Sequence, residues 1–338
     1  SNSGSASSAG GTETSASASA GTDSSADGKV LKYVMSKEPE TLDPNMNNYS
    51  TSSSVLQNLF TGLMQVGADG KLINGCAEKY EVSDDGLTYT FTLRDGLKWS
   101  DGSDLTAGDF EYAWKRALNP ETASPGVAYL YYVKNGQAYN EGNATEDEVG
   151  VKAVDDKTLE VTLENPTAYF PDLTAVTVYF PTKKDVVENS IPWTKSADTY
   201  VCNGAFRLKE INPQESYILE KNPEYYDAEN VKLDGVDIIF IESAEAALSA
   251  YNAGEVDVLD NAVLGTQARS QYDGSDELQS YDLIGTRYYD FNCSAEPVNN
   301  VLVRKAICLA IDRQSIIDNV VQVDAQPAYS FLAPGYSV

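Results

Sequence analysis

The segment from Ala77 to Gly102 constrains the fold of this chain more than any other. Its sequence is AEKYEVSDDGLTYTFTLRDGLKWSDG. Apolar and polar residues alternate around Tyr80 and again from Tyr89 to Leu93, which is the period of a half-buried strand. The intervening residues 84–86, Asp-Asp-Gly, have the composition of a tight turn. The segment therefore predicts two short strands arranged as a hairpin.

A helix is expected shortly after these strands. Thr106 has a side chain suited to a helix N-cap, and Asp109 follows three residues later, where a carboxylate can accept from free backbone N–H groups. Three large apolar residues then recur at helical spacing: Phe110, Trp114 and Leu118. The pattern predicts a helix over residues 109–118 with one buried face.

Further strands and helices follow from the same kinds of pattern. Strands are expected at 30–34, 149–154, 158–163, 205–209, 217–220 and 236–241, and helical segments at 55–63, 244–253 and 306–311. The segments 149–154 and 158–163 flank two aspartates and are expected to form a hairpin. This mixture of strands and helices is typical of an α/β protein.

The order of these landmarks resembles one family, the extracellular solute-binding proteins of peptide and nickel ABC transporters, also called the oligopeptide-binding lipoprotein family. Besides residues 77–110, the resemblance rests on TLDP at 41–44, LFTGL at 59–63, NPETASP at 119–125, VKAVDDKTLEV at 151–161, NGAF at 203–206, GEVD at 254–257 and VRKA at 303–306. A single short motif can arise by chance, whereas an ordered series along nearly the whole chain is specific.

The resemblance implies a periplasmic-binding-protein-like α/β fold of the class II type. A discontinuous domain I with a mixed sheet would comprise residues 30–60 and 182–284, and an inserted α+β domain II residues 61–181. Residues 285–338 would begin domain III, the second lobe. Members of that family continue well beyond this length, so a C-terminal part that completes domains I and III would be missing. An unpaired apolar face and low stability are expected of the chain alone.

The first 29 residues consist almost entirely of Ser, Gly, Ala and Thr. Such a segment cannot bury enough apolar surface to offset the entropy lost on ordering, so residues 1–29 are expected to form a disordered tether. In the resembled family this linker follows a lipidated cysteine, which is not part of this sequence. The resemblance therefore implies a protein anchored by lipid to the outer face of the bacterial cytoplasmic membrane.

The charge balance excludes one class of partner. The chain has 24 Lys and Arg against 51 Asp and Glu, a formal net charge of −27. Because this field repels phosphates, nucleic acid is not an expected partner. No apolar run is long enough to span a bilayer. The acidity suits a soluble secreted surface, and attraction of cationic peptides is the alternative.

Residue types and motifs point away from catalysis, metals and cofactors. Histidine is absent, which excludes a His-dependent triad, and the cysteines at 76, 202, 293 and 308 lack the spacing of zinc ligands. The nucleophile elbow, the phosphate loop and the dinucleotide-binding turn are also missing. The cysteines are expected to be small buried residues, above all Cys308, although two disulfides could also be drawn.

The resemblance implies capture of a ligand without chemistry. A short extended peptide would lie between two lobes and pair its backbone with protein backbone, and closure would present the loaded protein to the transmembrane subunits of an ABC permease. The positions that match the family's cleft are Asn48, Tyr49, Ser50, Gly126, Asp260, Asn261 and the stretch from Tyr288 to Asn292. Gly126 and Asp260 stand where some members have an aromatic residue, so the cleft is expected to be wider or more acidic here.

Each candidate has a structural alternative. Residues 48–50 can form a simple turn, and Tyr288 and Tyr289 can be packing residues of a strand. Trp99 and Trp114 are assigned to the core of domain II rather than to ligand stacking. If Asp260 faces the cleft, its carboxylate is expected to hold a cationic side chain or amine.

Two other functions remain open from the residues alone. An extracellular hydrolase could use carboxylates that no motif reveals, because their separation is a three-dimensional property. Capture of nickel or a metal chelate is less favoured, since this sequence contains no histidine.

Overall fold

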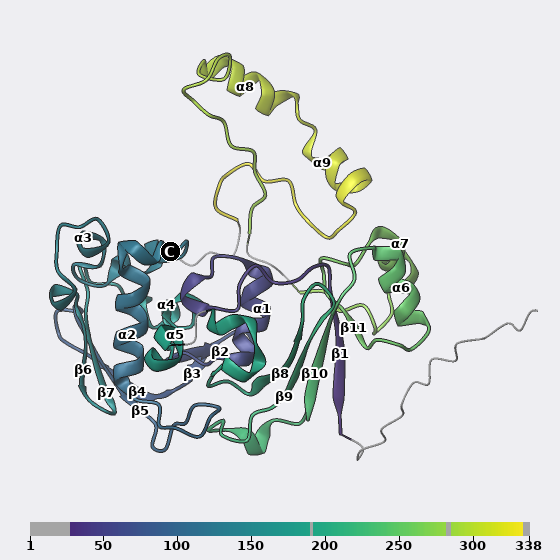
Figure 1. Ribbon diagram of the computed structural model, residues 1–338. Coiled ribbons are helices and arrows are strands. Elements are labelled where there is room, and N and C mark those ends of the chain that lie inside the picture. Colours follow the sequence, from purple (N-terminus) through teal and green to yellow (C-terminus); the bar gives the residue numbers. More distant parts are fainter. Residues whose placement is uncertain (1–27, 190–191, 282–284, 334–338) are drawn as a thin grey trace, which may run out of the picture.

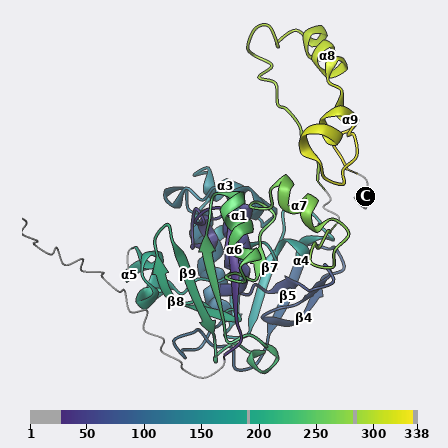
Figure 2. The same ribbon diagram turned by 90° about the vertical axis from the view of Figure 1, so that its right-hand side faces the viewer.

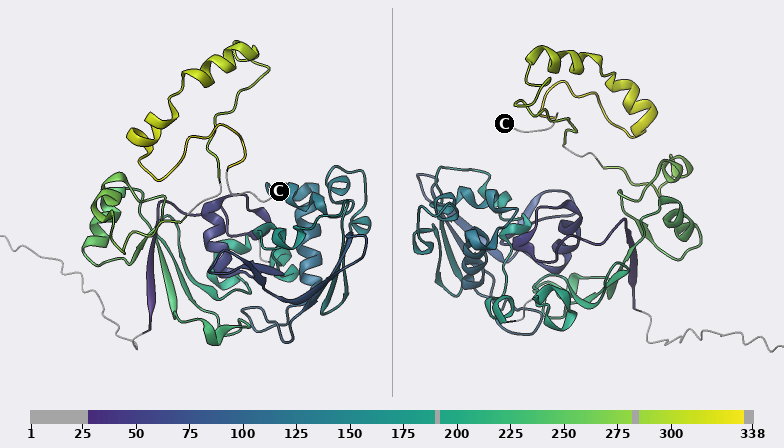
Figure 3. Two further views of the ribbon diagram at one scale, coloured as in Figure 1. Left: turned by 180° about the vertical axis from the view of Figure 1, so that it is seen from behind. Right: turned by 45° about the horizontal axis from the view of Figure 1, so that its top comes forward.

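A computed structural model describes residues 28–189, 192–281 and 285–333 (Figure 1). The predicted tether therefore lies outside the described residues except for Gly28 and Lys29. The backbone N–H of Lys29 already donates to Asp234 Oδ2 at 2.8 Å. Two sheets form the body of the molecule, and a helical segment after residue 285 is set apart from them (Figures 1 and 3).

The larger sheet is mixed. It contains β1 (Val30–Met35), β8 (Phe206–Asn212), β9 (Ser216–Lys221), β10 (Gly235–Phe240) and β11 (Val258–Leu259), in the order β11-β1-β10-β9-β8. Strand β1 runs parallel to both β10 and β11, whereas β9 is antiparallel to β8 and β10. The strands expected at 30–34, 205–209, 217–220 and 236–241 are confirmed, and β11 was not anticipated.

The second sheet is antiparallel and contains both predicted hairpins. Its strands are β4 (Ala77–Val82), β5 (Thr88–Leu93), β6 (Val151–Asp155) and β7 (Thr158–Thr162), in the order β4-β5-β7-β6. Alternation along β5 buries Tyr89, Phe91 and Leu93 and leaves the threonines between them partly exposed. The turn before β5 has Gly86 at φ 70°, a left-handed conformation that favours glycine.

Helix α2 (Ala107–Leu118) confirms the predicted helix and its cap. Thr106 and Asp109 form a capping box, in which the Thr106 N–H donates to Asp109 Oδ2 at 2.8 Å. The helix packs against β6 and β7 and buries Phe110 and Trp114. Both Trp99 and Trp114 are fully buried, as expected of core residues.

The first helix does not begin where the sequence pattern placed it. Helix α1 spans Ser50–Leu59, whereas an entry at 55–63 was expected, so the prediction was wrong by five residues at its start. The first turns consist of serine and threonine, so they show no apolar residues at helical spacing. The hydroxyls of Ser53 and Ser54 donate to backbone carbonyls four residues back in the helix. The chain is extended again at Phe60 and continues into β2 (Met64–Val66), which pairs with β3 (Leu72–Asn74).

Shorter helices cover the remaining faces. Helix α6 (Ala244–Asn252) was predicted, and with α7 (Thr266–Tyr272) it lies beside the β1–β11 end of the larger sheet (Figures 1 and 2). A small cluster of Val34, Ala247, Val256 and Val263 fills this contact. Elsewhere lie α3 (Gly136–Asn140), α4 (Phe170–Leu173) and α5 (Lys184–Asn189).

One large apolar core runs through both sheets. It includes Met35 and Ile238 from the larger sheet together with Phe91 and Leu159 from the smaller one. The two sheets draw their strands from 30–35 with 206–259 and from 77–162 respectively. Because their cores are continuous, the domain boundaries at 60/61 and 181/182 stay a prediction.

The segment 285–333 corrects two expectations. Tyr288 and Tyr289 lie in irregular chain rather than in a strand, and they are 57% and 81% exposed. Cys308 is exposed on α8 (Val301–Ala310), not buried, because nothing in the described chain packs over this face, where Leu309 is 87% exposed. Helix α9 (Arg313–Ile316) follows and leads into a π-helical turn at Ile317–Val321.

The four cysteines therefore divide into two pairs of different exposure. Cys76 and Cys202 are buried, as expected, whereas Cys293 and Cys308 are exposed, and all four are free thiols. The disulfides left open by the sequence are thus not formed.

Among the described residues, no helix has both the length and the apolar character needed to cross a membrane. The low stability expected of the chain alone stays a prediction.

Candidate ligand-binding site

The candidate residues near the larger sheet lie beyond the carboxyl ends of its parallel strands. Asp260 comes directly after β11, and the chain leaving β1 leads to the 3-10 turn η1 (Pro44–Met46) and then to Asn48. This edge lies on the side of the molecule where the segment 285–333 is found (Figures 1 and 3). Ligands of open α/β sheets bind at carboxyl edges of this kind.

A buried polar network fixes the chain just before Asn48. The side chain of Asn45 is fully buried, and its amide donates to the carbonyls of Val178 and Phe180 at 3.1 Å each. Its Oδ1 accepts from Arg116 Nη1 at 3.1 Å and from Thr182 Oγ1 at 2.9 Å. Every hydrogen-bonding capacity of this amide is thus used, which locks η1 against residues near 180.

An ion pair completes this network. Arg116 of α2 donates to both carboxylate oxygens of Asp43, at 3.0 Å to Oδ1 and 2.5 Å to Oδ2. Burial by itself would lower the pKa of Arg116, but the hydrogen bonds and charge of Asp43 outweigh it and raise the pKa. The TLDP motif is therefore anchored to α2 by a charged, bidentate contact.

The three candidates that follow this network are exposed. Asn48, Tyr49 and Ser50 all lie at the surface, and the side chain of Tyr49 is 47% exposed. Tyr49 is the N-cap of α1 and Ser50 its first residue, so the alternative of a simple turn over residues 48–50 is replaced by a short turn that leads into the helix. These side chains are accessible to a ligand, whereas the backbone just before them is fixed by the network of Asn45, Asp43 and Arg116.

Gly126 is placed beside this turn, but it does not widen the site. A Cβ atom added to Gly126 would lie 2.7 Å from the carbonyl oxygen of Asn47 and 3.4 Å from Val178. The glycine therefore permits close approach of two backbone segments, and a larger residue has no room. The expectation that Gly126 opens the cleft was wrong for this packing reason.

Asp260 and Asn261 lie at the end of β11. The N–H of Asp260 donates to Val34 O at 2.9 Å, and its side chain is half-buried. Burial, together with the charge and hydrogen bonding of Asp260, raises the pKa of Tyr33 to about 12. Asn261 is exposed and its Oδ1 accepts from Arg269 Nη2 at 3.0 Å.

Tyr288 and Asn292 lie in the segment that is set apart. The ring of Tyr288 contacts Phe331, with centroids 5.0 Å apart. Asn292 Oδ1 accepts from the N–H of Ser294 at 3.1 Å, which is the pattern of an Asx turn. In residues 28–189, 192–281 and 285–333, no hydrogen bond joins Tyr288 or Asn292 to the other candidates.

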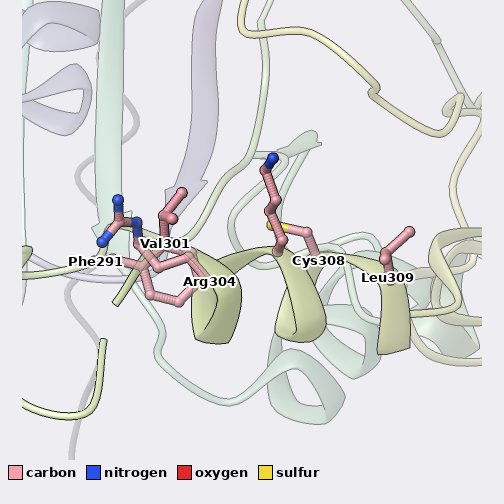
Figure 4. A pocket seen from close by; sticks show the side chains of 6 residues that line it. Phe291, Val301, Arg304, Cys308 and Leu309 are labelled. Carbon is pink, nitrogen blue, oxygen red and sulfur yellow. The ribbon is translucent and has the colours of Figure 1, made fainter. Parts of the chain in front are cut away.

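Two hollows accompany this arrangement. One, of about 270 Å³, lies between α1 and the larger sheet, where it is lined by Tyr33, Met35 and Val55 among others. The other, of about 480 Å³, lies against one face of α8, where Arg304 and Lys305 accompany the apolar Phe291, Val301, Cys308 and Leu309 (Figure 4). Of the predicted positions, only Phe291, from the stretch 288–292, lines the second of these two hollows, and none lines the first.

The sequence did not reveal the residues that support the site. Tyr33, Asn45, Asn47 and Arg116 were not singled out, although PNMN at 44–47 places two amides two residues apart after a turn-forming proline. That spacing was the only available signal, and it does not identify the partners. Within the described ranges, no three His, Cys, Asp or Glu side chains gather as a metal cluster would require.

The fold and the site together define a class, that of α/β solute-binding proteins with a mixed sheet and an inserted antiparallel one. The model of the bacterial extracellular solute-binding proteins, family 5, middle region, matches residues 71–338. The chain belongs to this family, which confirms the resemblance and the fold class inferred from the sequence.

Individual relatives support the same assignment. The chain is 41% identical over 330 residues to the oligopeptide-binding protein OppA of Bacillus subtilis, covering 95% of this chain and 61% of the relative. The structure of the murein tripeptide-binding protein MppA of Escherichia coli matches with a TM-score of 0.85 and 34% identity, covering 92% and 61% of the two chains.

A third relative was solved with a peptide. OppA of Haemophilus influenzae in complex with RPPGFSPFR matches with a TM-score of 0.80 and 31% identity, covering 91% of this chain and 60% of that one. The chain thus spans about three fifths of the length of the relatives it matches.

Proposed function

We propose that this chain is part of the substrate-binding component of an ABC importer, which captures extracellular oligopeptides between two lobes and delivers them to a membrane permease. The observation that carries the proposal is the likeness, in sequence and in fold, to the Haemophilus protein solved with a nonapeptide. One lobe would be formed by the two sheets, and the other would contain the segment 285–333.

The exposed turn at residues 48–50 and the edge at Asp260 are the proposed contacts on the first lobe. An extended peptide offers alternating N–H and C=O groups, which exposed main chain at such an edge can pair as an added strand does. Side chains would occupy the space around this pairing, bridged by water where direct contact is lacking. Binding of this kind needs no reacting group, so we propose that the ligand leaves unaltered.

The proposed location follows from the family. Its members are extracellular solute-binding proteins. We propose that a lipid anchor, attached to a cysteine before the Ser/Gly-rich segment, holds the protein at the outer face of the cytoplasmic membrane.

Native mass spectrometry of the intact gene product, purified from its own cells, tests the proposal. Co-purifying short peptides, released on mild activation at one equivalent per chain, are the expected result. A protein that carries no peptide and cleaves an added peptide or glycan would instead support the extracellular hydrolase. A bound nickel ion or chelate would support metal capture.

A further inference from the structure

The side chain of Asn47 is buried directly beneath the proposed contact turn. It is 3% exposed, and its amide is engaged on both sides. Its Oδ1 accepts from the backbone N–H of Tyr49 at 2.9 Å, and its Nδ2 donates to Ser53 Oγ and to Thr177 Oγ1, each at 2.8 Å. Three hydrogen bonds therefore converge on one amide that no ligand could reach.

These bonds join parts of the chain that are far apart in sequence. Ser53 lies in the first turn of α1, whereas Thr177 opens the 3-10 turn η5 (Thr177–Tyr179), 130 residues from Asn47. The backbone carbonyl of Asn47 packs against Gly126. A Cβ atom added to Gly126 would lie only 2.7 Å from the Asn47 carbonyl oxygen. Asn47 thus touches the three segments that surround the turn.

The consequence for the turn is a fixed backbone under exposed side chains. Asn48 and Tyr49 protrude, yet the N–H of Tyr49 is held by Asn47 and the Ser53 hydroxyl donates to the Tyr49 carbonyl at 3.0 Å. Loss of the Asn47 amide would leave the buried Thr177 hydroxyl, the partly buried Ser53 hydroxyl and one N–H to find other partners. The turn would then sample several conformations, and a ligand would have to select one of them.

We propose that Asn47 is a positioning residue of the peptide site. It sets the turn Asn48–Ser50 in its binding conformation and ties it to Thr177. The proposal rests on the proposed function, because it concerns the same site. A purely structural role would affect only stability. We instead expect the hydrogen bond between Asn47 and Thr177, as well as the bonds of Asn47 at the start of α1, to determine the affinity for peptide.

Thr177 offers a matched pair of variants. Thr177→Val has nearly the same shape but cannot accept from Asn47 Nδ2, whereas Thr177→Ser keeps the hydroxyl. If Asn47 acts through this contact, Thr177→Val weakens binding and Thr177→Ser does not. If the residue merely supports the fold, both variants differ from the wild type only in stability.

Two measurements on the intact gene product test the proposal. The first is NMR hydrogen exchange of the Tyr49 amide in the free protein, with the amides of residues 56–59 in the same helix as internal controls. Asn47→Ala is expected to speed exchange at Tyr49 about tenfold, and Thr177→Val by a smaller factor in the same direction. The amides at 56–59 should be unchanged in both variants.

The second measurement is the retention of a pool of pentapeptides with free termini, quantified by mass spectrometry. Affinity is expected to fall about tenfold for Asn47→Ala and about threefold for Thr177→Val, and to stay at the wild-type level for Thr177→Ser. Should Asn47→Ala fail to fold, the two Thr177 variants carry the test.

Unchanged exchange at Tyr49, unchanged affinity in Asn47→Ala, or equal losses in both Thr177 variants would overturn the proposal. A wild-type protein that retains no peptide overturns the proposed function instead. The exchange measurement then still decides whether Asn47 fixes the turn.

Discussion

Arg116 and Asp43 are joined by two hydrogen bonds across 73 residues of sequence, at 3.0 and 2.5 Å. Only 17% of the Arg116 side chain and 7% of the Asp43 side chain is exposed. The pair fixes the TLDP motif at 41–44 against α2. The position of the exposed turn at residues 48–50 therefore depends on this contact.

Removal of one partner should therefore be costly. Arg116→Ala is expected to lower the free energy of unfolding by about 3 to 5 kcal/mol, because it leaves the Asp43 carboxylate buried without its counter-charge. Lys157→Ala is the control, since Lys157 pairs with Asp95 where both side chains are more than half exposed, and it should cost less than about 1 kcal/mol. Urea unfolding measures both, and equal losses would contradict the assigned role.

Alanine substitutions at two glycines distinguish the effect of close packing from that of helix propensity. Gly126→Ala is expected to destabilise the protein by about 1 to 3 kcal/mol, because the new Cβ would press on the Asn47 carbonyl. Gly108→Ala, near the start of α2, meets nothing closer than 3.4 Å and should stabilise the protein by up to about 1 kcal/mol. Thermal unfolding measures both variants, and an unchanged or raised melting temperature in Gly126→Ala would contradict the close packing around Gly126.

The cysteines should react as two distinct pairs. Burial raises the pKa of both Cys76 and Cys202 to about 12, so almost no thiolate is present at these residues at pH 8. Cys293 and Cys308 are exposed. Ellman's reagent should therefore titrate two thiols quickly in the folded 338-residue chain and four after denaturation in guanidinium. Rapid reaction of all four in the folded chain would refute the burial of Cys76 and Cys202.

Asp260 should confer a preference for cationic ligands. Asp260→Asn is expected to reduce affinity for the peptide Ala-Ala-Lys-Ala-Ala about tenfold, and to leave the norleucine analogue unaffected, because only the lysine ammonium needs the carboxylate. Glu255→Gln removes a charge from an exposed position on the other side of β11 in the sequence and serves as control. Calorimetry with both peptides makes the comparison, and equal effects on both peptides would remove Asp260 from the site.

Structural features that depend on residues close together in the sequence could be predicted. The cap formed by Thr106 and Asp109, the alternation at Tyr89 and Phe91, and the turn at Gly86 each depend on residues a few positions apart. The start of helix α1 was predicted five residues too late because its first turns are serines, which carry no apolar period. Local pattern therefore succeeds only where side-chain chemistry differs along the element.

The support of the site depends on distant partners. Nothing local in the sequence joins Asn47 to Thr177 or Asp43 to Arg116, and only the fold brings them together. Gly126 suggested open space, yet the backbone of Asn47 occupies it. Cys308 lies in an apolar run, but its burial depends on what packs over α8, and no described segment does so.

The central claim is that the protein holds a peptide between its lobes and releases it chemically unchanged. Its most direct test is the recovery of an isotope-labelled pentapeptide pool from the intact gene product. After incubation, gel filtration and denaturation, one equivalent of peptide per chain should be recovered with every mass intact. Shortened or modified peptides, or none retained at all, would contradict the account.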